Sequence, residues 1–403
     1  MKRRQLLQAG FGLSALGLGG FSALSFANAS TSNRKLLTIY NKGGWDTPLV
    51  FDPHPDSNWI DVPDNTSISR FGNITIGSAP ERNAVSAFFQ QHSDKICIVN
   101  GIGVGSISHS KCEKMFFTGS RKTDAPDYAS MIAANHADDH PLPYVILSGP
   151  RMTGQFGSIA TNVDSVFSDI IQERDIVHQV PHDRIADFLL NQAQGSSEKL
   201  VQEYQASLER RIALNHWREL FNITGNLTTE EQLQMVSSLL SENIAQSVLL
   251  QLQLPTFHYW DTHSNNDQIQ SGCYNYLFEK LSTLIQILES TSDNEGNRLL
   301  DTTMVLVISE MGRMPMYNDS FGKDHWPYTS MMLLGSGVRA GEVVGATDDK
   351  LGGKTVSFST GEASDNGEIL TTENIVAGLL NRFDIDAEEY LGDVKPFSAC
   401  FDD

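Results

Sequence analysis

The sequence contains few cysteines for its length of 403 residues. Its four cysteines, Cys97, Cys112, Cys273 and Cys400, form no Cys-x-x-Cys pair, which argues against a structural zinc cluster built on thiolates. In an oxidising compartment one or two disulfides can form, but the spacing does not assign their partners. Cys97 lies inside an apolar segment, and we interpret it as a core thiol rather than a reactive one.

Positive charge is also scarce. Lysine and arginine together number 29 against 49 aspartate and glutamate residues, which gives a formal net charge of −20. Nucleic acids and anionic membranes select basic surfaces, because their phosphate groups are negatively charged. We therefore expect neither a nucleic acid nor an anionic membrane surface as a partner. The charge carries no information about the fold.

Long apolar runs are absent after the N-terminus, where no stretch approaches the roughly 20 residues of a membrane span. The N-terminus itself has the three regions of a signal peptide, Lys2-Arg3-Arg4, an apolar run from Ala9 to Phe26, and Ala27-Asn28-Ala29. We predict a signal peptide over residues 1–29. The arginine pair favours the twin-arginine route and a periplasmic or secreted protein. A Sec signal and an uncleaved anchor are the alternatives.

Internal repeats and low-complexity segments are absent from residues 30–403, which we predict to form a single domain. Short apolar segments alternate with segments of helical length, a pattern typical of an α/β fold. We expect a mostly parallel sheet with helices on both faces. The segments predicted to be buried strands are Leu36–Tyr40, Lys95–Val99, Tyr144–Leu147, Met304–Ile308 and Ser330–Leu334.

Helices are predicted over Ala84–Phe89 and Asp127–His136, and in three further places. A helical insertion is expected over about 184–252, where apolar residues recur at heptad-like spacing and Thr228–Glu231 has the pattern of a capping box. Further along, leucines at 277, 281, 284 and 288 fall on one face of a helix. A last helix is predicted over Thr372–Arg382.

Side chains able to bind a metal follow several of the predicted strands. Carboxylates and imidazoles are the ligands of zinc and manganese, and an α/β sheet gathers its sites at the carboxyl ends of its strands. Each residue alone has a simpler explanation, such as a turn aspartate, a surface histidine or a helix cap. Their shared position favours a metal site. The candidates are Asp46, His109, Asp261, His263, Glu310, Asp324 and His325.

Five motifs together resemble a large family of exported bacterial proteins, domain-of-unknown-function family 1501. They are Gly43-Gly44-Trp45-Asp46, Trp260-Asp261-Thr262-His263-Ser264-Asn265, Ser309-Glu310-Met311-Gly312-Arg313, Asp324-His325-Trp326 and the segment 341–348. That family is grouped with the alkaline phosphatase-like superfamily of phosphatases, sulfatases and phosphoglycerate mutases. The resemblance implies a three-layer α/β/α fold with metals at the carboxyl edge of the sheet. It also implies hydrolysis of phosphate or sulfate esters.

The same resemblance implies roles for individual residues. Asp46, Asp261, His263, Glu310, Asp324 and His325 match metal-ligand positions, although methionine follows Glu310 where the superfamily has a histidine. Zinc is the expected metal, with manganese, calcium or magnesium as alternatives. His109 occupies the nucleophile position. Either His109 is the nucleophile, or Ser108 replaces it, or His109 is a third imidazole ligand and water attacks, or the site is inactive.

Two interpretations of Arg313 and two of the whole protein follow. Arg313 either holds the phosphate or sulfate group of a substrate or forms an ion pair with a carboxylate. The protein is either a metal-dependent hydrolase of small-molecule or polysaccharide esters, or a non-catalytic metal-binding or envelope assembly protein. The sequence identifies neither the substrate nor the oligomeric state.

Overall fold

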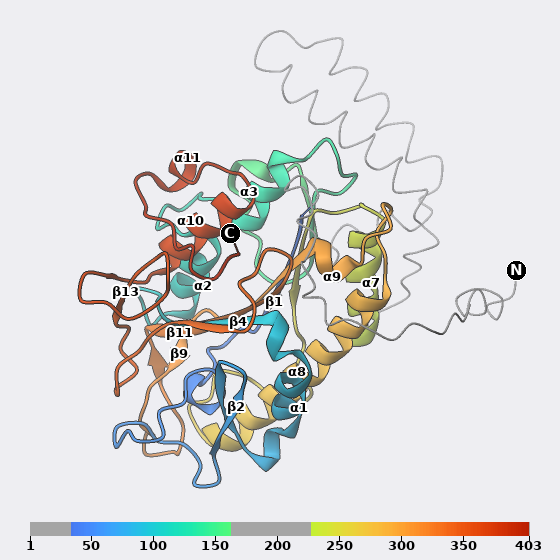
Figure 1. Ribbon diagram of the computed structural model, residues 1–403. Coiled ribbons are helices and arrows are strands. Elements are labelled where there is room, and N and C mark those ends of the chain that lie inside the picture. The colour runs from blue at the N-terminus through green and yellow to red at the C-terminus, as the bar shows by residue number, and fades with distance from the viewer. Residues whose placement is uncertain (1–33, 163–226, 403) are drawn as a thin grey trace, which may run out of the picture.

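The computed structural model describes residues 34–162 and 227–402 of the chain. The predicted signal peptide, residues 1–29, and the first part of the predicted helical insertion, residues 184–226, lie outside the described residues. In the described part, a central sheet lies between two groups of helices (Figure 1).

The central sheet has eight strands in the order β12-β4-β11-β8-β1-β7-β5-β6. Neighbouring strands run parallel, except that β11 runs antiparallel to both β4 and β8. The mostly parallel sheet predicted from the apolar segments is thus confirmed, because strands covered on both faces need uninterrupted apolar sequence. The strands are β1 (Lys35–Tyr40), β4 (Ile96–Gly103), β5 (Tyr144–Ser148), β6 (Ala160–Asn162), β7 (Ser247–Gln251), β8 (Thr303–Ile308), β11 (Tyr328–Gly335) and β12 (Glu342–Gly345).

Helices cover both faces of this sheet, which confirms the three-layer architecture. One apolar core joins the sheet to α1, α7, α8 and α9, and a second joins its other face to α2, α3 and α10. The two groups lie on opposite sides of the sheet in Figure 1, with α11 beside α10. The helices are α1 (Asn83–His92), α2 (His109–Thr118), α3 (Tyr128–Asn135), α7 (Thr229–Ser241), α8 (Asn266–Ser290), α9 (Leu299–Thr302), α10 (Thr372–Arg382) and α11 (Glu388–Leu391).

Local sequence signals explain several of these helices. The four predicted leucines of α8 are all buried, and full burial of one leucine side chain stabilises the fold by about 1.5–3 kcal/mol. Thr228 and Glu231 form the predicted capping box at the start of α7. Helix α10 has the predicted bounds.

The structure differs from the sequence prediction near residue 250. The segment Ser247–Gln251, predicted as the end of a helical insertion, is strand β7 and pairs with β1 and β5 at the centre of the sheet. A short apolar run such as Val248-Leu249-Leu250 fits a buried helix and a buried strand equally, so periodicity does not separate them. Strand β12, at one edge of the sheet, has only four residues and was not among the predicted strands.

Three two-stranded sheets lie outside the central sheet. They are β2 (Ser67–Phe71) with β3 (Ile74–Ser78), β9 (Gly312–Arg313) with β10 (His325–Trp326), and β13 (Thr355–Val356) with β14 (Glu368–Ile369). The pair β9–β10 matters for the site, because it sets His325 directly opposite Arg313.

All four cysteines are free and buried, so neither disulfide considered for an oxidising compartment forms in the structure. Burial raises the pKa of the Cys97 thiol to about 12, which agrees with an inert core thiol.

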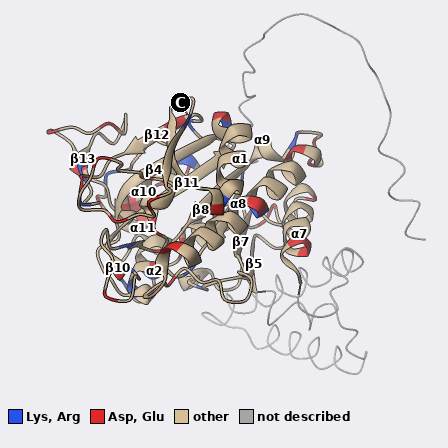
Figure 2. Cartoon of the chain, turned by 90° about the horizontal axis from the view of Figure 1, so that it is seen from below, with Lys and Arg blue, Asp and Glu red and all other residues tan. Residues whose placement is uncertain are grey.

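The excess of acidic residues is distributed rather than concentrated. In Figure 2, acidic residues (red) lie at many separate places around the sheet, with basic residues (blue) among them. Among residues 34–162 and 227–402, no helix has both the length and the apolar composition needed to span a membrane.

Candidate metal centre

Loops at the carboxyl ends of three parallel strands bring the candidate side chains together. His109 begins α2 after β4, Asp261 and His263 lie in the loop after β7, and Glu310 follows β8. His325 joins them from β10, and strand β11 begins two residues after β10 ends. The site therefore lies at the edge of the sheet where α/β proteins bind ligands.

Three imidazole rings converge through their Nε2 atoms. The Nε2 atom of His325 lies 3.0 Å from Nε2 of His109 and 3.1 Å from Nε2 of His263. The rings of His109 and His325 meet edge to face, with centroids 4.3 Å apart. All three rings are partly open to solvent, from 21% exposed at His325 to 48% at His263.

The carboxylate of Asp261 meets the same point. Its Oδ1 atom lies 3.4, 3.1 and 3.2 Å from the Nε2 atoms of His109, His263 and His325. Four donors arranged as a tetrahedron around zinc, at about 2.1 Å from the ion, lie about 3.4 Å from one another. The separations among His109, Asp261 and His325 lie near this value, so these three donors fit three corners of such a set. His109, Asp261 and His325 have ligand atoms that all lie within 4.8 Å of one another.

The Nδ1 atom of each ring lies within hydrogen-bond distance of an acceptor. Nδ1 of His109 lies 2.7 Å from Oε1 of Glu310, and Nδ1 of His263 lies 2.7 Å from Oδ1 of Asp324. Nδ1 of His325 lies 2.7 Å from the carbonyl oxygen of Ile107. A carbonyl or carboxylate acceptor needs a hydrogen on Nδ1, so in a neutral ring Nε2 carries the lone pair. The lone pairs of His109 and His325 and the Asp261 oxygen then face a common point, with Nε2 of His263 beside Asp261 and His325, an arrangement that suits a cation.

The charges around the cluster shift several pKa values. The hydrogen bond that His109 donates to Glu310 raises the pKa of His109. Burial opposes ionisation of Asp261, but the hydrogen bond and charge of Arg313 prevail and lower the pKa of this carboxyl to about 2. The hydrogen bond with His263 lowers the pKa of Asp324. Both carboxyl groups are therefore ionised at neutral pH.

Arg313 is fully buried and contacts the protein on every side of its guanidinium. Its Nε and Nη1 atoms donate to the carbonyl oxygens of Gly44 and Lys323, each at 3.0 Å. Its Nη2 atom donates to the carbonyl oxygen of Gly43 and, at 2.6 Å, to Oδ1 of Asp261. The ion pair with a carboxylate is the arrangement present, and it connects the turn after β1 to the loop that carries Asp261.

The two glycines of that turn leave room for these contacts. Gly43 and Gly44 have φ values of +128° and +85°, in the region that favours glycine. A Cβ atom on Gly43 would lie 2.8 Å from the backbone nitrogen of Asp261, and one on Gly44 would lie 2.8 Å from Cγ of Met311. The backbone nitrogen of Gly43 also donates to both carboxylate oxygens of Glu310, at 2.9 and 3.0 Å.

The carboxylate of Asp46 forms an ion pair with the ammonium group of Lys323. Its Oδ2 atom lies 2.9 Å from Nζ of Lys323 and accepts from Asn266 at 2.7 Å, and all of Asp46 and Lys323 is buried. Nζ of Lys323 also donates to the carbonyl oxygen of Asp61 at 2.7 Å. Burial raises the pKa of Asp46, and Lys323 and Asn266 oppose that shift. The Lys323 side chain thus places one positive charge beside Asp46.

The structure sorts the predicted site residues into two groups. Asp261, His263 and His325 meet at one point together with His109, which the sequence analysis had considered as a third imidazole. Glu310 and Asp324 lie outside this point and accept hydrogen bonds from the Nδ1 atoms of His109 and His263. Asp46 forms an ion pair with Lys323. Ser108 lies at the N-cap of α2, where its hydroxyl contacts Ser110 at 3.3 Å.

Sequence reasoning missed Lys323 and the carbonyl group of Ile107. Lys323 directly precedes Asp324-His325, but an isolated lysine in a polar loop has no pattern that predicts burial. A backbone carbonyl is present at every residue, so no sequence signal identifies the one that holds His325.

Comparisons with known proteins give the following similarities. A family model described as "Protein of unknown function (DUF1501)" matches residues 179–391. No curated protein matches the chain. Among solved structures, a protein in the alkaline phosphatase superfamily from Vibrio parahaemolyticus is 8% identical with a TM-score of 0.39, over 89% of this chain and 68% of that one.

Two further solved structures are a periplasmic domain and a soluble domain. The C-terminal periplasmic domain of EcEptC from Escherichia coli, in complex with Zn, is 7% identical with a TM-score of 0.43, over 89% of this chain and 84% of that one. The soluble domain of lipooligosaccharide phosphoethanolamine transferase A from Neisseria meningitidis is 11% identical with a TM-score of 0.39, over 94% and 96%.

Proposed function

This chain belongs to the family described as proteins of unknown function DUF1501, and from the geometry of its histidine cluster we propose that it is a metal-dependent hydrolase of phosphate or sulfate esters. The observation that carries the proposal is the meeting of the Nε2 atoms of His109 and His325 with a carboxylate oxygen of Asp261, at a partly exposed point beside His263. The ester class rests on the resemblance of its motifs to the alkaline phosphatase-like superfamily.

The donor set favours zinc. Three imidazoles and one carboxylate suit zinc better than calcium or magnesium, which take oxygen ligands. Manganese remains the first alternative, because it also accepts this mixture. A divalent ion held there would polarise an ester oxygen and lower the pKa of a water molecule.

The residues around the cluster have supporting tasks in this proposal. Glu310 and Asp324 hold the rings of His109 and His263 in one orientation, through hydrogen bonds to Nδ1. Arg313 positions Asp261 and keeps it ionised, rather than binding the phosphate or sulfate group itself. Asp261 and His263 are partly exposed, so a substrate can reach the cluster from their side.

Among the possible nucleophiles, the geometry favours water. His109 directs its Nε2 atom into the cluster and its Nδ1 atom at Glu310, which leaves neither nitrogen available for attack. A serine nucleophile needs a base in hydrogen-bond contact, and within the described residues the Ser108 hydroxyl meets only Ser110 and no such base. His109 therefore acts as a third imidazole ligand in the proposal.

The proposal is tested with the protein loaded with zinc or manganese. We expect turnover of an aryl phosphate, an aryl phosphodiester or an aryl sulfate, and loss of that turnover in His325→Ala. His136→Ala, at the surface after α3, is the matched control and keeps the activity. Absence of turnover with every ester, in protein shown to carry metal, would contradict the hydrolase function.

A second function has one observation in its favour. A fourth protein donor, Nε2 of His263, lies 3.1 Å from both Asp261 and His325, and four protein donors are typical of structural zinc sites, whereas catalytic sites keep an open position. A non-catalytic metal-binding or assembly protein of the envelope would carry such a site. Metal bound at one equivalent without turnover is the result that this alternative predicts.

We also propose export by the twin-arginine route, with cleavage after Ala29. The basis is the arginine pair Arg3-Arg4 ahead of an apolar run. In the native host, replacing both arginines by lysine should leave the full-length chain in the cytoplasm, whereas the unaltered chain should appear in the periplasm or medium beginning at Ser30. Unchanged export of the lysine variant would exclude the twin-arginine route.

A further inference from the structure

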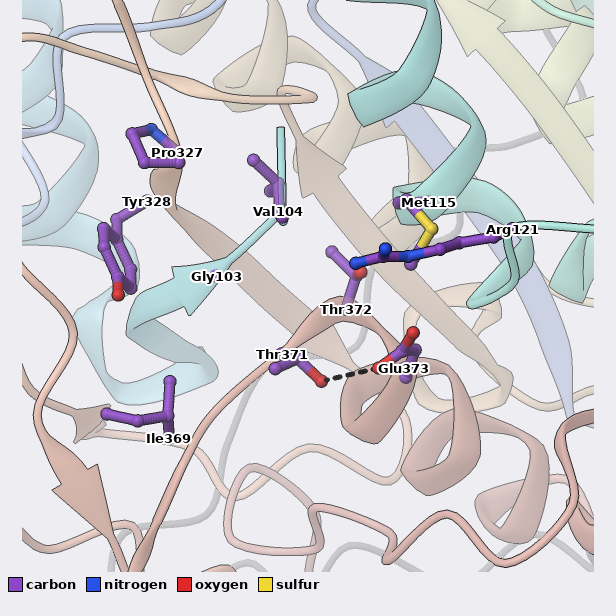
Figure 3. A pocket seen from close by; sticks show the side chains of 11 residues that line it. Gly103, Val104, Met115, Arg121, Pro327, Tyr328, Ile369, Thr371, Thr372 and Glu373 are labelled. Carbon is purple, nitrogen blue, oxygen red and sulfur yellow. Dashed lines mark hydrogen bonds between the residues drawn. The ribbon is translucent and has the colours of Figure 1, made fainter. Parts of the chain in front are cut away.

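A cavity of about 210 Å³ lies at the carboxyl end of β4, between α2 and the start of α10 (Figure 3). Its walls come from Gly103–Gly105, from Pro327 and Tyr328, and from the first residues of α10. None of the histidine-cluster residues lines it. The cavity is small compared with the roughly 300–1,000 Å³ of pockets for drug-sized ligands, so it suits a small molecule.

One buried hydroxyl in the cavity wall has no partner in the protein. Thr372 is only 1% exposed, and its Oγ1 atom makes no hydrogen bond with any of the described residues. Buried polar atoms are nearly always paired, because an unpaired one has lost its water without replacement. Figure 3 shows the Thr372 side chain at the cavity, on the side from which Arg121 approaches. A ligand atom in the cavity would satisfy this hydroxyl.

Arg121 brings a positive charge to the same space. The described parts of the chain give its guanidinium no ion pair and no hydrogen bond, although its carbonyl oxygen accepts from Lys114. Gly105, with φ +66°, leaves room for it, since Nη2 of Arg121 lies 3.4 Å from where a Cβ would be. A guanidinium without a protein acceptor is a ready partner for a carboxylate or another oxyanion.

The net charge of the walls limits which anion fits. The guanidinium contributes +1, Glu373 contributes −1, and the amino-terminal end of α10 adds about +0.5 of partial charge. The Glu373 carboxylate lies 3.5 Å from the Thr371 hydroxyl, at the rim of the cavity. The guanidinium and the helix end favour one carboxylate, whereas a second carboxylate near Glu373 would be repelled by it. The remaining walls, including Val104, Met115 and the Tyr328 ring, are apolar.

We propose that this cavity binds a small monocarboxylate with an apolar body. The carboxylate accepts hydrogen bonds from the Arg121 guanidinium and the Thr372 hydroxyl. The apolar body packs against Met115 and Tyr328, and Glu373 excludes dicarboxylates. This binding requires neither a metal in the histidine cluster nor hydrolysis. Its test is therefore independent of the test of the proposed function.

The test is calorimetric titration of the full chain with three aromatic probes. Benzoate should bind, whereas benzyl alcohol, which lacks the charge, should bind at least about tenfold more weakly. Phthalate, a dianion, should not bind measurably. Absence of heat with benzoate at about 10 mM would overturn the proposal.

Paired variants assign the binding to this cavity. Thr372→Val should weaken benzoate binding by about five- to tenfold, and Thr372→Ser, which keeps the hydroxyl, should change it little. Arg121→Gln should weaken it by at least about tenfold, and Arg151→Gln, a surface arginine outside the cavity, should not. Equal affinities of the two arginine variants would overturn the proposal.

Glu373→Gln separates an anion site from a site for neutral polar molecules. If the ligand is a monocarboxylate, this variant should bind benzoate more tightly and begin to bind phthalate, because a repulsive charge is removed. If Glu373→Gln weakens binding as Arg121→Gln does, the ligand class is wrong. This comparison also decides the matter if the buried Thr372→Val variant does not fold.

Discussion

The Nε2 atoms of His109 and His325 face each other at 3.0 Å, although 216 residues separate them in the chain. Each ring presents its lone pair to the other, because the Nδ1 atoms are engaged by Glu310 and by the carbonyl of Ile107. Two lone pairs at this distance repel unless a proton or a metal ion lies between them. The contact therefore suits a proton or a metal ion, and the first prediction tests the metal ion.

We expect the purified protein to bind one equivalent of zinc, and His109→Ala and His325→Ala to bind less than about a tenth of that under the same conditions. Free metal at about 100 times its Kd should raise the free energy of unfolding by about 2.7 kcal/mol. Elemental analysis and thermal unfolding measure both effects. His136→Ala serves as the control, and stoichiometric zinc in His325→Ala would refute the cluster.

The outer carboxylates should contribute unequally to metal affinity. Glu310 is fully buried and Asp324 is about half exposed, so only Glu310 holds its histidine without competition from water. We expect Glu310→Gln to weaken zinc binding about 10- to 100-fold, and Asp324→Asn to weaken it less. Competition with a zinc chelator measures both constants. Equal losses in the two variants would show that burial of the carboxylate is unimportant.

The buried ion pair of Asp46 and Lys323 should matter for stability. Lys323→Met leaves the Asp46 carboxylate buried without its counter-charge, which should lower the free energy of unfolding by about 3–5 kcal/mol. The double variant Asp46→Asn with Lys323→Met removes both charges and should recover part of that loss. Urea denaturation measures all three proteins. A double variant no more stable than Lys323→Met would mean that the unpaired charge is not the cause.

Asp127 should make stability depend on pH. It is fully buried, and burial raises its pKa from 3.8 to about 6, although Ser130 donates to it at 2.6 Å. The folded state therefore binds the proton more tightly than the unfolded state. Its contribution is fully present below about pH 4 and is lost as the pH rises to about 6, in total about 3 kcal/mol.

The measurement is the difference in unfolding free energy between the unaltered chain and Asp127→Asn. This difference should fall by about 3 kcal/mol between pH 4 and pH 7. Asp365→Asn, at an exposed carboxyl without a hydrogen-bond partner among the described residues, is the matched control for the loss of one negative charge. A flat difference for Asp127→Asn would contradict the raised pKa.

The strands and several helices were predictable because their signals are local. Each predicted strand, such as Met304–Ile308, is a short apolar run, and the sheet buries each of them on both faces. Helix α10 was predicted with its bounds because its apolar face lies within its own eleven residues. Strand β7 was missed, because its five residues suit two structures and only pairing with β1 and β5 selects one.

The sequence by itself determined which loops carry the site, since acidic and histidine residues follow the strands whose ends meet at one edge of the sheet. Only the tertiary structure decided what each residue does there. Glu310 and His109 lie 201 residues apart, and whether a carboxylate reaches the centre or a ring nitrogen depends on ångström-scale backbone positions. Lys323 likewise became the partner of Asp46 only through folding, because a buried charge is stable where an opposite charge meets it.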